Sequence, residues 1–235
     1  MRLIKKIRLL WAKRNSESYV SYLRSKGVKI GANTYIRDPK SFGIDLQRAH
    51  LITIGSNVRF NYNNRLIAHD AAAKVFQLKY QDYLPSNGHI TIGNNVWFAR
   101  DVRVLKNVTI GDNCIIGLGS VVTHDIPANS VAAGVPARVV CTLDEYYEKR
   151  KEESLEESFE FARGIVERYH RRPVPADFRE SFVWFVNGKE MEQYPELPFK
   201  HQLGPAYEQY KANHVAKFAS FDEFLKAAGI EVSEK

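Results

Sequence analysis

Residues 88–140 read GHITIGNNVWFARDVRVLKNVTIGDNCIIGLGSVVTHDIPANSVAAGVPARVV, and a large apolar residue recurs in them at every sixth position. The recurring residues are Ile92, Phe98, Val104, Ile110, Ile116 and Val122. Four positions after each stands a smaller or β-branched residue, in the series Val96, Val102, Val108, Cys114, Ser120 and Ile126. A period of six fits neither an amphipathic helix nor an alternating strand, whose periods are about 3.6 and about 2 residues. It is typical of a hexapeptide β-helix.

In such a β-helix each hexapeptide forms one short strand on one wall of a three-sided prism. The large residue points into the axis, and the smaller residue lies where two walls meet. Three hexapeptides close one coil, and successive coils stack ~4.8 Å apart, so that backbone groups pair with the coils above and below. Asn57, Asn95 and Asn113 suit corners that need a positive φ.

The same phase extends towards the N-terminus through Ile54-Gly55 and Ile30-Gly31, so we expect a repeat domain over residues 28–140. Leu66 and Ile92 are 26 positions apart, which is not a multiple of six, and residues 70–89 lack the pattern. We expect residues 70–89 to form a loop that leaves the prism, and a long excursion from a rigid solenoid usually builds a functional site. A second, softer interruption lies around residues 38–50.

Residues 1–27 predict a basic amphipathic helix at the N-terminus. Its apolar residues recur at helical spacing and are Leu3, Ile4, Ile7, Leu10 and Trp11. Two interpretations stay open. In the favoured one the helix closes the end of the main domain or of a neighbouring subunit, and in the other residues 1–15 lie on an anionic membrane surface.

Residues 141–235 predict a helical C-terminal extension. A helix is expected from Asp144 to about Arg171, ended by Pro173 and Pro175, and one face of it carries Leu155, Phe159, Ala162, Val166 and Tyr169. Residues 176–235 are rich in aromatic side chains and are expected to be α-rich. Covering the open end of the prism is the favoured role, because solenoids need terminal caps. Recognition of an acceptor is the alternative.

The net charge of +7 is concentrated at the N-terminus, since nine of the 34 Lys and Arg residues, and one acid, lie in residues 1–29. The rest of the chain is nearly neutral, which argues against a nucleic-acid partner. No run of about 18 apolar residues is present. The two cysteines, Cys114 and Cys141, suggest a reducing compartment. The expected location is therefore the cytoplasm, and the basic helix would place the protein at the inner face of the membrane if it binds lipid.

On these residues the block 88–140 resembles the hexapeptide-repeat acyltransferases, and is most similar to the sugar O-acetyltransferases. That group includes maltose and galactoside acetyltransferases and capsular-polysaccharide O-acetyltransferases. The resemblance implies an all-β core in the form of a left-handed parallel β-helix, a homotrimer and an active site between neighbouring subunits. It also implies acetyl-CoA as the donor, no metal, and acetyl transfer to a hydroxyl of a sugar or of a surface-polysaccharide precursor.

In this family a single histidine precedes the excursion, and an Ile-Gly-Asn-Asn-Val-Trp strand follows it. Here His69 precedes the excursion and residues 92–97 match that strand. The resemblance therefore makes His69 the general base that removes the hydroxyl proton while the oxygen attacks the thioester directly, a task that suits an imidazole. Trp97 resembles the family tryptophan beside the active site. Asp70 is not expected to orient His69, because neighbouring residues on a strand point to opposite faces.

The resemblance places the coenzyme along the prism, in contact with Arg100, Leu118, Ser120, Thr123, His124 and Arg138. Arg138 suits a phosphate, because a guanidinium group can pair with two oxygens at once. Arg100 replaces a small residue at a position whose backbone N–H is expected to help hold the thioester oxygen. His124 replaces the usual lysine.

Other β-helix proteins fit less well. Carbonic anhydrases of the γ class need two zinc-binding histidines five positions apart, and no two of the seven histidines have that spacing. Serine acetyltransferases carry a long N-terminal helical domain, for which 27 residues leave no room. An antibiotic acetyltransferase and, from a different class, a catalytically silent trimeric scaffold stay open. The excursion and the aromatic tail are expected to select the acceptor, but neither has a readable code.

Overall fold

The structure is a computed structural model that describes residues 2–231, with side chains from residue 7 onward. The side chains of Leu3 and Ile4, which belong to the predicted N-terminal helix, lie outside the described part. The chain divides into two compact units, Met1–Tyr147 and Glu148–Lys235, which are described separately.

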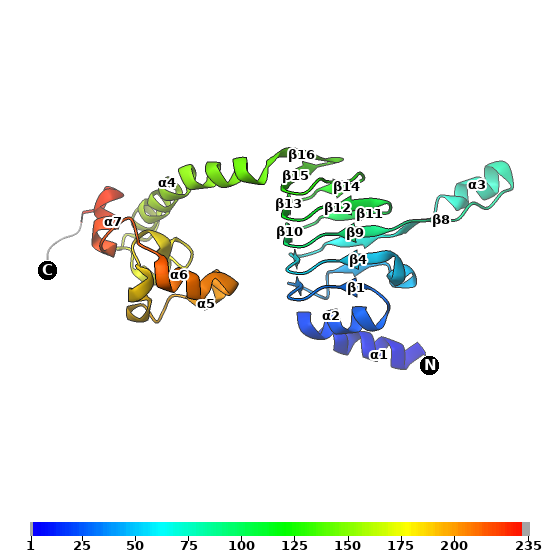
Figure 1. The fold of residues 1–235 in the computed structure, drawn as a ribbon, viewed down its shortest axis with the longest axis horizontal. Coiled ribbons are helices and arrows are strands. Elements are labelled where there is room, and N and C mark those ends of the chain that lie inside the picture. The colour runs from blue at the N-terminus through cyan, green and yellow to red at the C-terminus, as the bar shows by residue number, and fades with distance from the viewer. Residues whose placement is uncertain (1, 232–235) are drawn as a thin grey trace. The chain divides into compact units, whose positions relative to one another are not determined.

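The first unit is a parallel β-helix with three walls (Figure 1). The first wall consists of β1 (Lys29–Ile30), β4 (Ile52–Ile54), β9 (Ile90–Ile92) and β12 (Val108–Ile110). The second wall consists of β2 (Tyr35–Ile36), β5 (Arg59–Phe60), β10 (Val96–Phe98), β13 (Cys114–Ile116), β15 (Ser130–Gly134) and β16 (Ala137–Thr142). The third wall consists of β3 (Gly43–Ile44), β6 (Arg65–Ile67), β11 (Arg103–Leu105) and β14 (Val121–Val122). All these pairings are parallel except that of β16, which returns antiparallel to β15.

One strand from each wall makes one coil. The number of residues per coil shows where the six-residue repeat is regular and where it is interrupted. The backbone N–H of Asn94 bonds to Asp112 in the next coil, 18 residues on, which equals three hexapeptides. The corresponding offsets are 24 residues between Asn33 and Asn57 and 38 residues between Ser56 and Asn94. The extra residues are the two interruptions that the sequence predicts, of which the earlier one includes a 3₁₀ helix, Leu46–Leu51.

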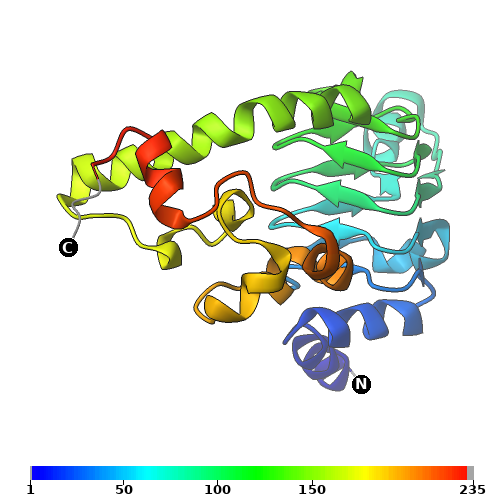
Figure 2. The ribbon, with the colours of Figure 1, turned by 60° about the vertical axis from the view of Figure 1, so that its left-hand side comes forward.

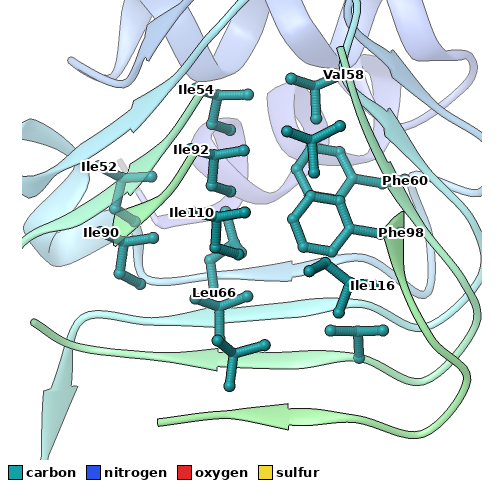
Figure 3. Packing of buried hydrophobic residues seen from close by; sticks show 14 of the residues in the cluster. Ile52, Ile54, Val58, Phe60, Leu66, Ile90, Ile92, Phe98, Ile110 and Ile116 are labelled. Atoms are coloured by element: carbon teal, nitrogen blue, oxygen red, sulfur yellow. The ribbon is translucent and has the colours of Figure 1, made fainter. Parts of the chain in front are cut away.

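The predicted inward-facing residues fill the core of the β-helix. Each of the six large residues from Ile92 to Val122 is at most 1% exposed, and their six smaller partners are also buried. Figure 3 shows Ile54, Ile92 and Ile110 in one column and Phe60 beside Phe98 in another. The rings of Phe60 and Phe98 stack with centroids 4.6 Å apart.

Asparagines turn the corners of the coils, as predicted. Asn57, Asn95 and Asn113 have φ values of 58°, 54° and 57°, in the left-handed region that asparagine tolerates better than most residues. Their side-chain amides also bond from coil to coil, with Asn95 Nδ2 donating to Asn113 Oδ1 at 2.9 Å and Asn113 Nδ2 to Asn129 Oδ1 at 3.0 Å.

The N-terminal segment is helical, as predicted, but it is divided into two helices, α1 (Arg2–Ala12) and α2 (Ser16–Ser25). The break has a local cause, because the Asn15 side chain accepts a hydrogen bond from the Ser18 N–H at 2.9 Å and starts a new helix. Tyr19, Val20 and Leu23 of α2 are buried in the same core as the first coil, so α2 closes this end of the β-helix. Among the described residues, no helix combines the length and the apolar character needed to cross a bilayer.

The excursion leaves the prism where the sequence predicts, but it is a hairpin that carries a helix rather than a loop (Figure 1). Strands β7 (His69–Asp70) and β8 (Ser86–Asn87) pair antiparallel at its base, and α3 (Ala73–Tyr80) lies between them in sequence. The Asp70 carboxylate accepts a hydrogen bond from Ser86 Oγ at 2.6 Å and pairs with Lys106 Nζ at 2.9 Å. These contacts tie the two strands of the hairpin together at its base.

The second unit has its own aromatic core. Helix α4 (Leu143–Tyr169) crosses the boundary between the units, and its buried residues are Ser158, Ala162 and Ile165. Ala162 is buried as predicted, and Leu155 and Phe159 pack against the same core. Val166 and Tyr169, also predicted on the apolar face, are 37% and 69% exposed, and Ile165 is buried instead.

The rest of the second unit consists of short helices. They are 3₁₀ helices Pro175–Asp177, Ser181–Trp184, Gly188–Gln193 and Gly204–Ala206, with α5 (Phe199–Leu203), α6 (Tyr207–Asn213) and α7 (Phe221–Ala227). Helix α7 lies beside α4 (Figure 2), where Arg163 donates to the carbonyl of Ala228 at 3.3 Å.

Candidate active site

His69 stands where the chain leaves the third wall for the excursion. Strand β6 ends two residues earlier, and His69 then pairs with Asn87 across the base of the hairpin. The His69 side chain is 37% exposed. The backbone of this histidine is therefore held on both sides while its ring stays accessible.

A carboxylate that the sequence analysis missed holds the imidazole. Nδ1 of His69 donates to Oδ2 of Asp45, whose side chain is only 8% exposed. Asp45 follows β3 directly, and β3 lies beside β6 in the third wall, with Ile44 opposite Leu66. Because the carboxylate occupies Nδ1, the proton of a neutral imidazole lies there, and Nε2 has a lone pair available to accept a proton.

Asp45 belongs to the earlier of the two interruptions, and Arg48 from the same segment completes the arrangement. Arg48 Nη1 lies 3.6 Å from Asp45 Oδ2, and its Nε donates to Oδ1 of Asn87 on the returning strand of the hairpin. The interruption thus supplies both charged groups behind His69. In sequence, the only sign of this contact is that a polar residue, Asp45, follows Ile44 one coil before His69. Because that coil is irregular in length, the six-residue repeat does not reveal that Asp45 and His69 meet.

Asp70 does not orient His69, in agreement with the sequence analysis. Its carboxylate faces Ser86, Lys106 and the backbone N–H of Ala72 instead. The Ser86 hydroxyl, together with the Lys106 ammonium, holds the pKa of the Asp70 carboxyl well below its usual range. Asp70 therefore fixes the base of the excursion.

Trp97 and Arg100 lie away from His69 within one chain. Trp97 points outward from β10 in the second wall and is 43% exposed. Arg100 lies just before β11, and its guanidinium carbon is 4.9 Å from the centre of the Tyr62 ring. Because β11 pairs in parallel with β6, a residue before β11 and a residue after β6 stand at opposite edges of the third wall. A single chain therefore does not bring Arg100 and His69 together.

Three of the residues predicted to contact the coenzyme do meet. His124 and Arg138 line a surface hollow of about 480 Å³, together with Asp125, Ile126, Ala137 and Val139. Thr123 Oγ1 lies 2.8 Å from His124 Nδ1. This hollow offers two side chains that can bind an anionic group.

Leu118 and Ser120, which are also predicted to contact the coenzyme, differ in their exposure to solvent. Leu118 is 70% exposed and offers an apolar surface. Ser120 is fully buried, where its hydroxyl donates to the Gly117 carbonyl at 2.7 Å and accepts from the Gly134 N–H at 3.2 Å. The Ser120 hydroxyl is thus used to close the corner, and a contact of this residue with the coenzyme stays a prediction. In the described part of the chain, no three histidine, cysteine or acidic side chains are grouped to hold a metal ion.

The fold and the site define a class of protein, the hexapeptide-repeat transferases. Residues 89–124 match the family model described as "Bacterial transferase hexapeptide (six repeats)". The chain belongs to this family.

Two relatives show in more detail which proteins the chain is similar to. The chain is 39% identical over 146 residues to the galactoside O-acetyltransferase of Escherichia coli (strain K12), a match that covers 58% of this chain and 66% of that protein. It is 54% identical over 57 residues to a putative acetyltransferase of Staphylococcus aureus (strain MRSA252), covering 24% of this chain and 29% of that protein. The chain thus spans just under two thirds of the first relative and less than a third of the second.

Solved structures give weaker likenesses. A maltose O-acetyltransferase from Clostridium difficile 630 has a TM-score of 0.41 and 28% identity, with 60% of this chain and 84% of that chain covered. A hexapeptide-repeat acetyltransferase of Vibrio cholerae, complexed with acetyl-CoA, has a TM-score of 0.43 and 26% identity, with 50% of this chain and 61% of that chain covered.

Proposed function

We propose that this protein is an acetyl-CoA-dependent O-acetyltransferase that acts on a hydroxyl of a carbohydrate. The observation that carries the proposal is the His69 ring, with Nδ1 bonded to the nearly buried Asp45 carboxylate and the ring itself open to solvent. Membership of the transferase family and the similarity to a galactoside O-acetyltransferase support the donor and the class of acceptor. A left-handed coil and a place in surface-polysaccharide synthesis are part of the same proposal.

His69 acts as the general base in the proposed reaction. The acceptor oxygen attacks the thioester carbonyl while Nε2 of His69 takes the hydroxyl proton. The resulting imidazolium is stabilised by the Asp45 carboxylate on Nδ1. When the carbon–sulfur bond breaks, the proton passes from His69 to the departing thiolate, which leaves an acetyl ester and free CoA. The backbone N–H at Arg100 would stabilise the negative oxygen of the tetrahedral intermediate.

The coenzyme would extend across the third wall, from Leu118 before β14 to His124 after it. Arg138 and His124 supply positive charge and hydrogen-bond donors for its phosphates in the hollow that they share. Leu118 offers an apolar surface for the pantetheine arm, and Trp97 forms a wall of the acceptor site.

We expect a homotrimer. His69 and Arg100 stand at opposite edges of one wall, so only a neighbouring copy can place an Arg100 beside a His69, and rotational symmetry then completes every site alike. Light scattering should report about three times the chain mass of 26.9 kDa. A monomer with full acetyl-transfer activity would contradict the shared site.

Asp45→Asn is expected to lower kcat about 10- to 100-fold and to leave the KM for acetyl-CoA nearly unchanged, the size typical of a residue that orients a functional histidine. An amide in place of the carboxylate no longer stabilises the imidazolium. Asp45→Glu should recover part of the rate, because it restores the charge.

The matched control for Asp45 is Asp70→Asn, at the other carboxylate next to His69. Asp70 bonds to Ser86 and Lys106 rather than to the imidazole, so its loss should lower kcat much less. Equal losses of kcat in the two asparagine variants would show that Asp45 has no special link to His69.

The proposed function is tested directly by incubating the protein with acetyl-CoA and a panel of glycans, nucleotide sugars and antibiotics, with free thiol as the readout. Carbohydrates are expected to be the acceptors. Turnover with antibiotics alone would support a xenobiotic acetyltransferase. No turnover together with no calorimetric acetyl-CoA binding would support a silent scaffold.

A further inference from the structure

Cationic and aromatic side chains form a continuous row on the outside of the second wall and at its corner with the third. They are Tyr35, Arg37, Arg59, Tyr62, Trp97 and Arg100, and are called the cation–aromatic track below. The track begins beside the predicted active-site wall and runs towards the N-terminal end of the β-helix.

Strand register fixes the first half of the track. Tyr35 pairs with Arg59, and Arg59 pairs with Trp97, on three successive parallel strands. Their neighbours Ile36, Phe60 and Phe98 are buried, so these three side chains point outward. Adjacent strands are ~4.8 Å apart, which places Tyr35 about 10 Å from Trp97 along the wall. Tyr35 is 42% exposed, and the Arg59 guanidinium carbon lies 5.9 Å from the centre of its ring.

The second half of the track is a stack at the corner. The Tyr62 ring has the Arg37 guanidinium carbon 5.4 Å from its centre and the Arg100 guanidinium carbon 4.9 Å from it. These contacts come from the coil before and the coil after. Contact with the ring holds each guanidinium in position. Arg37 also hydrogen-bonds to the Tyr62 side chain, which leaves its other N–H groups for an anion.

The charges of the track are not neutralised within the chain. No carboxylate in the part that the structure describes forms an ion pair with Arg37, Arg59 or Arg100. Some exposed arginines elsewhere do have such partners, as Arg163 does in Glu156. Three exposed guanidinium groups are therefore available to an anionic ligand.

At its N-terminal end the track opens into a surface hollow of about 860 Å³. Its charged lining residues are the cations Lys13, Arg14, Arg24, Arg37, Lys40 and Arg59 and the acids Glu17 and Asp38. The Asp38 carboxylate accepts a hydrogen bond from the backbone N–H of Lys40 at 3.0 Å, so it is engaged by its own turn. The hollow extends the positive surface beyond the last ring of the track.

We propose that the cation–aromatic track binds an acidic oligosaccharide and presents it to the active site beside Trp97. This inference rests on the proposed function and names its acceptor class. Exposed aromatic rings pack against the C–H faces of sugar rings, and guanidinium groups pair with two carboxylate oxygens at once. A row that spans three strands suits a linear chain rather than a compact anion. Acids and bases nearly balance outside the first 29 residues, which disfavours a nucleic acid.

The test is calorimetric binding of a hexamer of galacturonic acid, in the absence of acetyl-CoA, with maltohexaose as the neutral comparison. We expect the acidic hexamer to bind at least about tenfold more tightly, and its affinity to fall with added salt. Arg59→Gln should weaken this binding about tenfold, because a charge-assisted contact is lost. Its matched control is Arg168→Gln, on an exposed arginine of α4 in the second unit.

The aromatic half of the track has its own matched pair of variants. Tyr35→Ser should weaken binding of the acidic hexamer several-fold, whereas Tyr169→Ser, on a tyrosine of α4 that is 69% exposed, should not. Equal binding by wild type and Arg59→Gln, or equal affinities for the acidic and neutral hexamers, would overturn the proposal. A six-residue thymidine oligonucleotide that binds more tightly than the acidic hexamer would overturn it in favour of a nucleic acid.

The binding measurement tests the cation–aromatic track, and the thiol-release assay tests the proposed function. Either result can be negative while the other is positive. Binding of the acidic hexamer without acetyl transfer to any acceptor would support the track and refute the proposed function. Acetyl transfer to neutral sugars without binding of the acidic hexamer would do the reverse.

Discussion

His69→Ala is expected to lower kcat for acetyl transfer by about 10²- to 10⁴-fold, the usual contribution of a general base. Without the imidazole, neither neighbouring carboxylate is a ready substitute, because Asp70 is already engaged by Ser86 and Lys106 and the Asp45 side chain is only 8% exposed. The measurement is the initial rate of thiol release at saturating acetyl-CoA. Retention of more than about a tenth of the wild-type rate would remove His69 from the mechanism.

Two further variants separate chemistry from binding. His89→Ala removes the histidine at the other end of the excursion, whose side chain is exposed, and should leave the rate close to wild type. Arg138→Ala should raise the calorimetric dissociation constant for acetyl-CoA about tenfold, because a charged phosphate contact is lost, whereas His69→Ala should leave that constant nearly unchanged. If His69→Ala instead abolished coenzyme binding, its loss of rate would not report on proton transfer.

Phe98→Ala is expected to lower the free energy of unfolding by about 3–5 kcal/mol, the range for truncating a buried phenylalanine. Phe98 has no exposed surface and stacks on Phe60, which in turn meets Phe42 edge-on with centroids 5.0 Å apart. Removing the ring leaves a cavity between coils that cannot close, because the backbone of each coil is bonded to its neighbours. Denaturant unfolding at one fixed protein concentration measures the change.

The control for Phe98 is the adjacent outward-facing residue. Trp97→Ala should cost less than about 1 kcal/mol, since its side chain is 43% exposed and lies outside the core. Phe98→Leu offers a smaller perturbation should the alanine variant fail to fold, with an expected loss of about 1–2 kcal/mol. Equal losses of stability at positions 97 and 98 would contradict the alternation of inward and outward residues on β10.

The six-residue repeat was sufficient to predict the walls of the β-helix. Each strand pairs with the strand one coil on, so that Thr91 faces Thr109 and Ile92 faces Ile110. The same environment therefore recurs at a fixed sequence interval, and every inward position must carry an apolar side chain. The corners were readable for the same reason, because a left-handed turn favours asparagine at Asn57, Asn95 and Asn113.

The excursion could be predicted from the break in the six-residue repeat, and His69 could be predicted as the residue at its base. The charged residues that contact or lie near the His69 ring could not be predicted. Asp45 and Arg48 come from an interruption whose length follows no repeat, so their distance along the chain does not reveal which later residue they meet. Only the path of the folded chain decides that meeting.

Burial of individual polar groups also depended on the tertiary structure. The hydroxyl of Ser120 occupies a position that resembles a ligand contact in sequence, yet it bonds inward to Gly117 and Gly134. The cation–aromatic track likewise exists only after folding, since Tyr35, Arg59 and Trp97 come from three different coils. A periodic sequence determines which residues share a wall, because its pairing is local and regular. The groups that meet across coils of unequal length are determined by the three-dimensional course of the insertions between them.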